Sequence, residues 1–422
     1  MRIVFVHRRV YPEATGGTYS YIHELGRRLA ARGHEVDVIT STRAPDPVRP
    51  YELEGMTIHP YAYRRSNPVL STYRHTTNTN AIFERIAARN SVDVLSIHES
   101  QLGHKLAKSP LGRSVCQIPT FHAPVFLEYR YDTAWRVRAE KSPLKRIAHR
   151  LTEPLIEHQI RRFERDVLSA ADGVVVLSAY SRSHIENHFP SVDLGKVKII
   201  PGGVDVDRFR PSDDKAGVRR ALGLPQEPVY LLSVRNLTPR MGLEKLVDAV
   251  ARIGGSGSAN GIDLRLLIVG EGPLRESLEQ RIRDHGLGDA ISLVGRVPNE
   301  DLPRFYQAAD LFVLPTTAME GFGIVTVEAL SSNLPVVGTP AGATPEILQR
   351  IDDRLVTRDT TAEAIGDSIS AWLRWRDEDS GTTRYRDEVL SRYTWDAVTE
   401  AVEDHYRKTV QAFRARRAEH RA

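Results

Sequence analysis

The sequence predicts an α/β protein of two domains, each built on a parallel sheet covered by helices. Short β-branched runs alternate with longer amphipathic stretches along nearly the whole chain of 422 residues, and this rhythm is typical of parallel sheets with helices on both faces. The rhythm restarts after Pro201-Gly202-Gly203. Because a chain of this length also exceeds one ordinary core, we expect an N-terminal domain over 1–203 and a C-terminal domain over 204–396.

Apolar runs rich in β-branched residues mark the strands. In the N-terminal half we expect strands at Arg2–Val6, Glu35–Ile39, Asp93–Ile97, Ile118–Phe121, Gly173–Leu177 and Val197–Ile200. In the C-terminal half we expect them at Val229–Val234, Leu264–Val269, Ala290–Val294, Asp310–Leu314 and Pro335–Val337. Sheets of this kind bind ligands in a crevice at the carboxyl ends of their strands.

Helical spacing of apolar residues separates these strands. The examples are Tyr19–Ala31, Leu243–Ala251, Pro273–His285 and Glu300–Ala309, and the chain finishes with an expected helix over Trp395–Phe413. The segment Gly255–Gly261 has the composition of a flexible surface loop.

The composition is that of an ordinary globular protein, with 41% hydrophobic and 27% charged residues. The single cysteine, Cys116, excludes an internal disulfide framework and suits a reducing compartment. The first apolar run, Met1–Val6, ends at His7, and no later stretch approaches the roughly 20 apolar residues of a membrane span. We expect a cytoplasmic protein.

The net charge of +4, from 58 basic and 54 acidic residues, does not argue for a nucleic-acid partner. The basic residues are unevenly spread, and many crowd the segment 136–165. Peripheral contact of this segment with the inner face of a membrane, an anionic acceptor and a solvated helix face all remain open. The residues concerned are Arg136, Arg138, Lys141, Lys145, Arg146, Arg150, Arg161, Arg162 and Arg165, with Arg414, Arg416, Arg417 and Arg421 in the C-terminal tail.

The most informative motif is a glycine-rich loop between a predicted strand and a predicted helix. It reads Glu320-Gly321-Phe322-Gly323-Ile324 and leads into a helix that carries Glu328. Glycines before a helix let backbone N–H groups approach an anion, which the positive end of the helix dipole favours. A carboxylate one to two turns inside that helix can accept hydrogen bonds from the vicinal hydroxyls of a ribose.

This motif resembles the paired-glutamate signature of retaining glycosyltransferase family 4. The resemblance implies the GT-B fold, in which two Rossmann-like domains face each other across a deep cleft and a C-terminal helix, here 397–422, joins the N-terminal domain. It also implies that Glu320 faces the donor sugar of a nucleotide sugar and that Glu328 holds the nucleotide ribose. The loop backbone from Gly321 to Ile324 would meet the diphosphate.

Further segments resemble the family in order and spacing. Pro201–Asp205 resembles the interdomain segment, although Gly202 stands where asparagine is usual. The turn with Gly270 and Gly272 would border the nucleotide, and the backbone at Arg296 and Val297 would meet the base. Pro335–Gly338 with Gly342 resembles the last strand and turn.

The cationic partners of the diphosphate depart from the family pattern. The family offers an arginine and a lysine where this chain has Asn236 and Met241, while Arg235 and Arg240 stand one residue earlier. Either arginine can turn into the crevice, and Arg240 is favoured because the loop beside it can re-aim its side chain. That both are solvated surface residues remains the alternative.

Three groups of residues stand out at strand ends in the N-terminal half. The loop with Gly16 and Gly17 would face the diphosphate, and the resemblance places His122 at the family's active-site histidine, near the reacting carbon. His98 and Glu99 follow another strand and are candidates for an acceptor pocket. Val125–Arg165 matches no assignable pattern, so the acceptor, which we expect to be a hydroxyl-bearing glycan, lipid-linked molecule or natural product, stays open.

The resemblance implies transfer with retention of anomeric configuration, catalysed by positioning and charge stabilisation. We expect no cofactor and no metal, and we assign the acidic triplet Asp205-Val206-Asp207 to turn and capping roles. A Rossmann oxidoreductase is disfavoured, since Arg275 stands where the third glycine of its fingerprint belongs. A sugar-nucleotide epimerase or hydrolase of the same fold, and a non-catalytic sugar-nucleotide sensor, remain alternatives.

Overall fold

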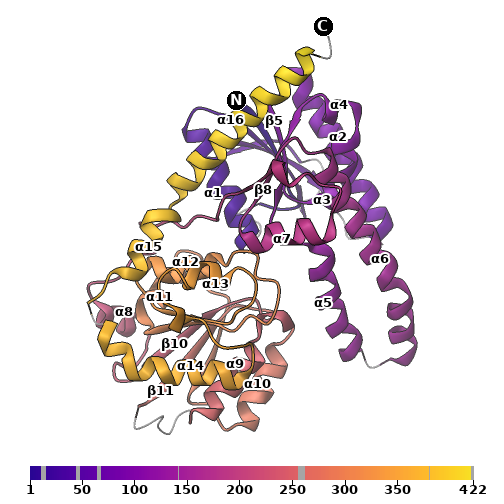
Figure 1. The fold of residues 1–422 in the computed structure, drawn as a ribbon. Coiled ribbons are helices and arrows are strands. Elements are labelled where there is room, and N and C mark those ends of the chain that lie inside the picture. The colour runs from indigo at the N-terminus through magenta and orange to yellow at the C-terminus, as the bar shows by residue number, and fades with distance from the viewer. Residues whose placement is uncertain are drawn as a thin grey trace. The chain divides into compact units, whose positions relative to one another are not determined.

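The computed structural model describes residues 1–10, 16–43, 48–63, 68–140, 142–254, 262–379 and 381–419. The chain separates into two compact units (Figure 1). Unit 1 comprises Met1–Thr133, Val137–Gly202 and Trp395–Ala422, and unit 2 comprises Gly203–Thr394 with Ala134–Arg136. The expected flexible loop Gly255–Gly261 lies outside the described residues.

Unit 1 holds a sheet of six strands in the order β3-β4-β2-β1-β5-β6. All neighbours are parallel except β3, which pairs antiparallel with β4. A second, three-stranded parallel ladder has the order β7-β8-β9. The bounds are β1 Arg2–Val6, β2 Glu35–Thr42, β3 Tyr51–Leu53, β4 Met56–Ala62, β5 Val94–Ile97, β6 Cys116–Gln117, β7 Thr120–Phe121, β8 Val174–Val176 and β9 Val197–Ile199.

Two features of these strands differ from the sequence prediction. The hairpin β3–β4 was not expected, because its strands mix polar and apolar residues; it turns at Glu54 and Gly55, both with positive φ (48° and 82°), as a tight hairpin turn requires. The strand expected over Ile118–Phe121 is interrupted at Pro119, which has no N–H to donate. There the ladder changes partner: Ile118 N donates to Leu95 O, whereas Pro119 O accepts from Val175 N.

Unit 2 holds one five-stranded sheet in the order β12-β11-β10-β13-β14. Every neighbouring pair is parallel, and each expected strand of this half is present within one residue at either end. Apart from the edge strand β12 the strands are largely buried, so their near-continuous apolar runs are explained by helices on both faces. The bounds are β10 Val229–Val234, β11 Leu264–Val269, β12 Ile291–Gly295, β13 Leu311–Leu314 and β14 Val336–Gly338.

Helices connect the strands in both units (Figure 1). Unit 1 contains α1 Gly17–Ala31, α2 Pro68–Arg89, α3 Ser100–Lys108, α4 Pro110–Arg113, α6 Pro143–Ala170, α7 Ala179–His188 and most of α5 Val125–Ala139. Unit 2 contains α8 Lys215–Ala221, α9 Leu243–Arg252, α10 Arg275–Asp284, α11 Leu302–Ala308, α12 Ile324–Ser331, α13 Thr344–Leu348, α14 Ala362–Trp375 and α15 Arg384–Arg392. None of the helices, over the residues described, combines the length and the apolar character needed to cross a bilayer.

The stretch that the sequence left unassigned forms the antiparallel pair α5 and α6. Glu164 Oε1 on α6 accepts a hydrogen bond from Val125 N at the start of α5 (2.7 Å), and Arg130 on α5 pairs with Glu157 on α6. Apolar and charged residues are mixed around α5, so the sequence shows no apolar stripe of helical period that would predict this helix.

The last helix, α16 Trp395–Glu419, packs on unit 1. Glu403 accepts from Arg32 (3.1 Å) and pairs with His34 (3.0 Å), while Tyr406 Oη lies 3.1 Å from Ser96 Oγ on β5. These contacts confirm that the C-terminal helix joins the N-terminal domain, as the fold class implied.

Candidate active site

The candidate donor-side residues of unit 2 all follow the carboxyl ends of its strands. Arg235 follows β10, Gly270 and Gly272 follow β11, and Arg296 and Val297 follow β12. The loop Glu320–Gly323 lies between β13 and α12. Because all five strands are parallel, these segments share one edge of the sheet, where α/β folds bind their ligands.

A buried ion pair lies at the centre of this edge. Nη2 of Arg235 donates to Oε2 of Glu320 at 2.5 Å, and both side chains are about nine-tenths buried. The hydroxyl of Thr316 lies 2.8 Å from the same Nη2 and 3.1 Å from the same Oε2. Nε of Arg235 is buried without a hydrogen-bond partner, so the guanidinium keeps an unused donor.

The backbone around Glu320 is held from both sides. Nη1 of Arg240 donates to the carbonyl of Met319 (3.1 Å), whose φ of 67° is in the left-handed region. The carbonyl of Glu320 accepts from Ala343 N (2.8 Å). A Cβ on Gly342 would come within 2.2 Å of that carbonyl oxygen, so only glycine fits there. Arg240 therefore supports the loop through its backbone.

Helix α12 begins directly after this loop with no side-chain cap. Its first residue is preceded by Gly323, with φ of 93°, a conformation that glycine adopts readily. The first N–H groups of a helix have no partner inside the helix, and they attract anions. The hydroxyl of Thr326 in the first turn is also buried without a partner. The side chain of Phe322 packs against Tyr393 (ring centroids 5.8 Å apart), so its ring is engaged within unit 2.

Glu328 lies in the second turn of α12, where Tyr306 Oη donates to its Oε2 at 2.7 Å. Burial raises the pKa of Glu328 to about 7, against the lowering effects of this hydrogen bond and of Arg208. The sequence offered no local signal for Tyr306, because it approaches from α11, 22 residues away.

Unit 1 gathers a second polar cluster at the carboxyl ends of its strands. Glu99, after β5, pairs with Arg8, after β1: Oε1 lies 2.5 Å from Arg8 Nη2, and Oε2 accepts from Arg8 N (3.0 Å). Burial disfavours the charged carboxylate, but Arg8 and then His7 outweigh it, so the pKa of Glu99 is below its usual value. Arg8 was not anticipated as a site residue.

His98 and His122 lie side by side in the same region. Nδ1 of His98 is 3.0 Å from Nε2 of His122, and Nε2 of His98 is 3.2 Å from Ser96 Oγ. Burial, and to a smaller extent His7, lowers the pKa of His122 to about 3. Burial also holds the pKa of His98 well below its usual value, followed by the effects of His122 and His7. Both rings are therefore neutral at physiological pH.

The remaining candidate residues are placed as follows. Gly17 is the first residue of α1 and Gly16, with φ of 135°, precedes it, while residues 11–15 lie outside the described part. Asp205 accepts hydrogen bonds from Asp207 N (3.2 Å) and Arg208 N (3.0 Å), which is the turn-capping role expected for it. Within the described residues no three His, Cys, Asp or Glu side chains are grouped as metal ligands.

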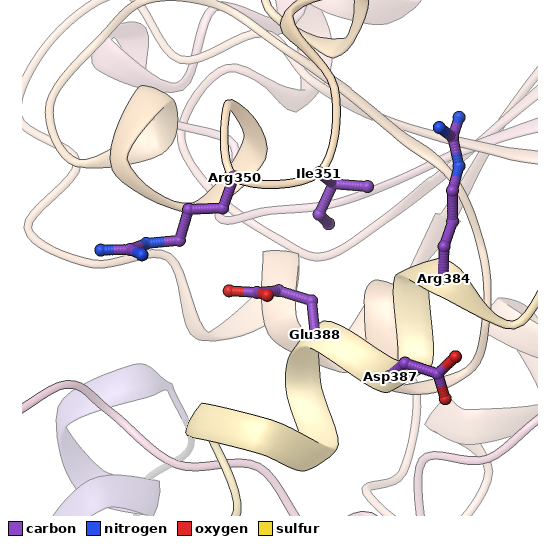
Figure 2. A pocket seen from close by; sticks show the side chains of 5 residues that line it. All are labelled: Arg350, Ile351, Arg384, Asp387 and Glu388. Carbon is purple, nitrogen blue, oxygen red and sulfur yellow. The ribbon is translucent and has the colours of Figure 1, made fainter.

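A separate hollow lies on unit 2 beside α15. Figure 2 shows it between Arg350 and Ile351 on one side and Arg384, Asp387 and Glu388 on the helix. Arg384 also pairs with Asp352 (3.2 Å). This hollow contains none of the residues that the sequence singled out.

Comparison with solved structures defines the fold. Sucrose-phosphate synthase from Thermosynechococcus elongatus is similar over 97% of this chain and 99% of its own, with a TM-score of 0.77 and 22% identity. This likeness places the two units in the GT-B fold of glycosyltransferases and confirms the fold class predicted from the sequence.

Comparison of sequences defines the family. The model described as Glycosyltransferase Family 4 matches residues 15–208, and the model described as Glycosyl transferases group 1 matches residues 214–385. The chain therefore belongs to glycosyltransferase family 4, as its glutamate motif indicated.

Two curated relatives illustrate the range of the family. A GDP-mannose-dependent alpha-(1-6)-phosphatidylinositol monomannoside mannosyltransferase of Mycobacterium tuberculosis is 30% identical over 253 residues, which is 58% of this chain and 63% of that protein. D-inositol 3-phosphate glycosyltransferase 2 of Catenulispora acidiphila is 26% identical over 95% of this chain and 92% of its own. The chain thus spans less than two thirds of the length of the mycobacterial relative that it matches.

The buried pair Arg235–Glu320 generates a stability prediction. Arg235→Met leaves the Glu320 carboxylate buried and uncompensated, so we expect a loss of about 3–5 kcal/mol in the free energy of unfolding. The double variant Arg235→Met/Glu320→Gln removes the uncompensated charge and should recover part of this loss. Urea unfolding of the whole protein, followed by tryptophan fluorescence, measures the free energy of unfolding of both variants. Equal midpoints for Arg235→Met and the unmodified protein would show that the pair does not hold the loop.

Proposed function

We propose that the protein is a retaining, metal-independent glycosyltransferase that moves a hexose from a nucleoside-diphosphate sugar to a hydroxyl acceptor. The observation that carries this proposal is the arrangement around α12. One glutamate, Glu320, is fixed by Arg235 at the mouth of the uncapped helix, and a second, Glu328, lies within its second turn. A diphosphate suits the backbone N–H groups and the positive dipole end at the start of such a helix.

We assign the parts of the donor along the sheet edge of unit 2. Glu328 accepts hydrogen bonds from the ribose hydroxyls, and Glu320 holds hydroxyls of the transferred sugar. The N–H groups from Gly321 to Ile324 receive the diphosphate. The turn with Gly270 and Gly272 borders the nucleotide, and the backbone of Arg296 and Val297 meets the base. The glycine turn of unit 1, Gly16-Gly17, offers further N–H groups to phosphate.

Of the two candidate cations, Arg235 suits the donor better than the sequence suggested. Its Nε has no partner, so it can donate to the donor while Nη2 continues to hold Glu320. Arg240 supports the loop through Met319 O. We assign Arg235 to positioning Glu320 and to charge stabilisation. We assign Arg240 chiefly to shaping the loop Glu320–Gly323.

The transfer proceeds as a front-side displacement. The bond between the anomeric carbon and the departing phosphate oxygen breaks, the acceptor oxygen bonds to that carbon from the same face, and the acceptor proton passes to the departing phosphate. Retention follows from the shared face. The protein contributes alignment and preorganised donors for the developing charge.

We propose that His122 supports the transferred sugar through a ring N–H, because its low pKa keeps the imidazole neutral. His98 has both ring nitrogens engaged within the protein, so we assign it to holding His122 and no longer to the acceptor. Glu99, fixed by Arg8, remains the candidate for contacting acceptor hydroxyls.

The names of the relatives narrow the substrates to be tested. One uses GDP-mannose and a phosphatidylinositol monomannoside, and another acts on inositol 3-phosphate. We propose a nucleoside-diphosphate hexose as donor and an inositol-bearing or lipid-linked alcohol as acceptor. We place the protein in the cytoplasm, where its buried thiol, Cys116, stays reduced.

We further propose that the segment 136–165 contacts an anionic membrane surface. Four apolar side chains at helical spacing on α6 are more than half exposed: Leu144 (80%), Ile147 (56%), Leu151 (70%) and Leu155 (72%). A row of exposed aliphatic residues is unusual on a soluble surface. Lys145, Arg146 and Arg150 flank it, and Glu153, the one acid between Pro143 and Leu155, pairs with His149 (3.2 Å). An apolar stripe with basic flanks suits insertion at a lipid headgroup boundary.

The alternatives predict different chemistry. An epimerase or hydrolase of the same fold consumes the nucleotide sugar without an acceptor, and a sensor binds it without turnover. A transferase releases nucleoside diphosphate in step with glycosylated acceptor.

The transfer reaction tests the main proposal. A panel of nucleotide sugars is screened by thermal shift, since a tight donor raises the melting temperature, and the best donor is assayed with inositol-bearing and lipid-linked alcohols in excess EDTA. We expect product with a retained anomeric centre, and a kcat lower by about 100-fold or more in Glu320→Gln. Asp207→Asn in the connector is the matched control and should retain full turnover. Loss of all turnover in EDTA, or donor consumption that ignores the acceptor, would overturn the proposal.

The pKa of Glu328 predicts how donor affinity depends on pH. A ribose bound as proposed requires the carboxylate, so affinity should rise with pH through about 7 and fall by about tenfold per pH unit below it. The nucleotide sugar itself has no phosphate that titrates in this range. Glu328→Gln should lose this dependence, and Glu328→Ala should raise the donor KM far more than it lowers kcat. Calorimetry at pH 5.5 to 8.5 measures the affinities; the same pH profile in Glu328→Gln would contradict the ribose role.

Vesicle binding tests the contact surface on α6. We expect co-sedimentation with phosphatidylcholine vesicles that contain phosphatidylglycerol, and weaker binding at high salt. The triple variant Leu144→Ser/Ile147→Ser/Leu151→Ser should bind about tenfold more weakly or worse. Leu390→Ser, at an exposed leucine of α15 in unit 2, is the control. Vesicle binding of the triple variant equal to that of the unmodified protein would reject the membrane assignment. So would the finding that the unmodified protein is a dimer and the triple variant a monomer, because the stripe would then be a contact between two copies of the chain.

A further inference from the structure

Four polar side chains of unit 1 form a continuous line of hydrogen bonds that ends at His122. Tyr406 Oη on α16 lies 3.1 Å from Ser96 Oγ on β5, although 310 residues separate them. Ser96 Oγ lies 3.2 Å from His98 Nε2, and His98 Nδ1 lies 3.0 Å from His122 Nε2. The C-terminal helix is thereby connected to the candidate active-site histidine.

Burial fixes the direction of these hydrogen bonds. Tyr406 and Ser96 are fully buried, and Ser96 is the one hydrogen-bond partner of the phenol among the described residues. A buried O–H needs an acceptor, so Tyr406 donates to Ser96. The serine hydrogen is then directed to Nε2 of His98.

The same donor-to-acceptor direction continues through the two imidazole rings. A neutral imidazole has one N–H and one acceptor nitrogen. Since Nε2 of His98 accepts, Nδ1 carries the hydrogen and donates to Nε2 of His122. His122 must then keep its own hydrogen on Nδ1. The opposite direction would leave the Tyr406 hydroxyl hydrogen buried without an acceptor, which is unfavourable.

The surroundings keep both rings neutral and in place. The ring of His98 packs edge-on against Phe5 (centroids 5.0 Å apart), and the ring of His122 packs edge-on against Tyr21 (5.1 Å). Burial lowers the pKa of both histidines, to about 3 for His122. Each ring therefore carries one hydrogen, whose position the line of hydrogen bonds decides.

We propose that Tyr406, through Ser96 and His98, is a positioning residue that holds His122 in the tautomer with hydrogen on Nδ1. His122 then presents an N–H to its surroundings. It serves as a hydrogen-bond donor to an oxygen of the substrate and has no free lone pair with which to act as a base. This last step rests on the role of His122 in the proposed transfer, whereas the tautomer itself does not.

The tautomer is measured directly on the free protein. In protein labelled with ¹⁵N-histidine, two-bond ¹H–¹⁵N correlation spectra at pH 7 distinguish the protonated from the unprotonated ring nitrogen, and His122→Gln assigns the signals. We expect Nδ1–H on both His98 and His122. Tyr406→Phe removes the hydroxyl but keeps the ring, and should give mixed tautomers at His122. In the transfer assay it should lower kcat several-fold with little change in the donor KM.

Tyr21→Phe is the matched control, because the hydroxyl of Tyr21 is buried beside the same rings without a hydrogen-bond partner. It should leave the His122 signals unchanged. An Nε2–H signal for His122 in the unmodified protein overturns the proposal, even if no variant folds. An unchanged spectrum in Tyr406→Phe overturns the role of Tyr406. Activity that is absent while the tautomer is as expected would reject the proposed transfer and leave the positioning intact.

Discussion

The buried ion pair between Arg235 and Glu320 is the constraint on which the candidate donor site depends. Both charged groups are almost fully buried and share the hydroxyl of Thr316. A buried carboxylate without its cation is strongly unfavourable, so the loop after β13 is tied to the end of β10. Ala343 N and the side chain of Arg240 fix the adjoining backbone. These contacts fix the loop that precedes α12 and thereby the position of the N-terminus of this helix.

The same principle organises unit 1, where polar groups at strand ends are satisfied by partners from distant elements. Glu99 is held by Arg8, His98 by Ser96, and Ser96 by Tyr406 of the last helix. Glu164 of α6 fixes the start of α5, three residues after His122. Burial raises the pKa of Glu164 to about 8, so the carboxyl is mostly protonated at neutral pH. In each case a hydrogen bond or ion pair inside unit 1 fixes the orientation of the polar group.

Much of the fold could be predicted from the sequence, because buried parallel strands are apolar runs whose bounds are clear. The five strands of unit 2 illustrate this. The hairpin β3–β4 was missed because its alternating stretches, Tyr51–Leu53 and Met56–His59, are short and the second is interrupted by Pro60. The helices α5 and α6 were not predicted either. Helix α5 has no apolar stripe, and the apolar stripe on α6 is exposed instead of facing the protein core.

The candidate site was predictable where a motif is local and not where it depends on partners far along the chain. Glu320, Glu328 and the glycines between them lie in one short segment, which the sequence marks by itself. Tyr306 donates a hydrogen bond to Glu328, and Tyr406 is connected to His98 through Ser96. Both tyrosines come from other elements, and no local sequence motif marks them. Loop flexibility favoured Arg240 over Arg235 as the phosphate ligand. The contacts around Glu320, where Arg240 holds Met319 O and Nε of Arg235 has no partner, are the reason why we propose the opposite order.

We propose that Glu320 and Glu328 hold an activated sugar from the two sides of the start of α12. A crystal structure of the protein with an intact nucleotide sugar tests it most directly. We expect sugar hydroxyls within hydrogen-bonding distance of Glu320, ribose hydroxyls on Glu328 and the diphosphate against the backbone between Gly321 and Ile324. A ligand bound elsewhere, with Glu320 still paired only with Arg235 and Thr316 and Glu328 only with Tyr306, would contradict it.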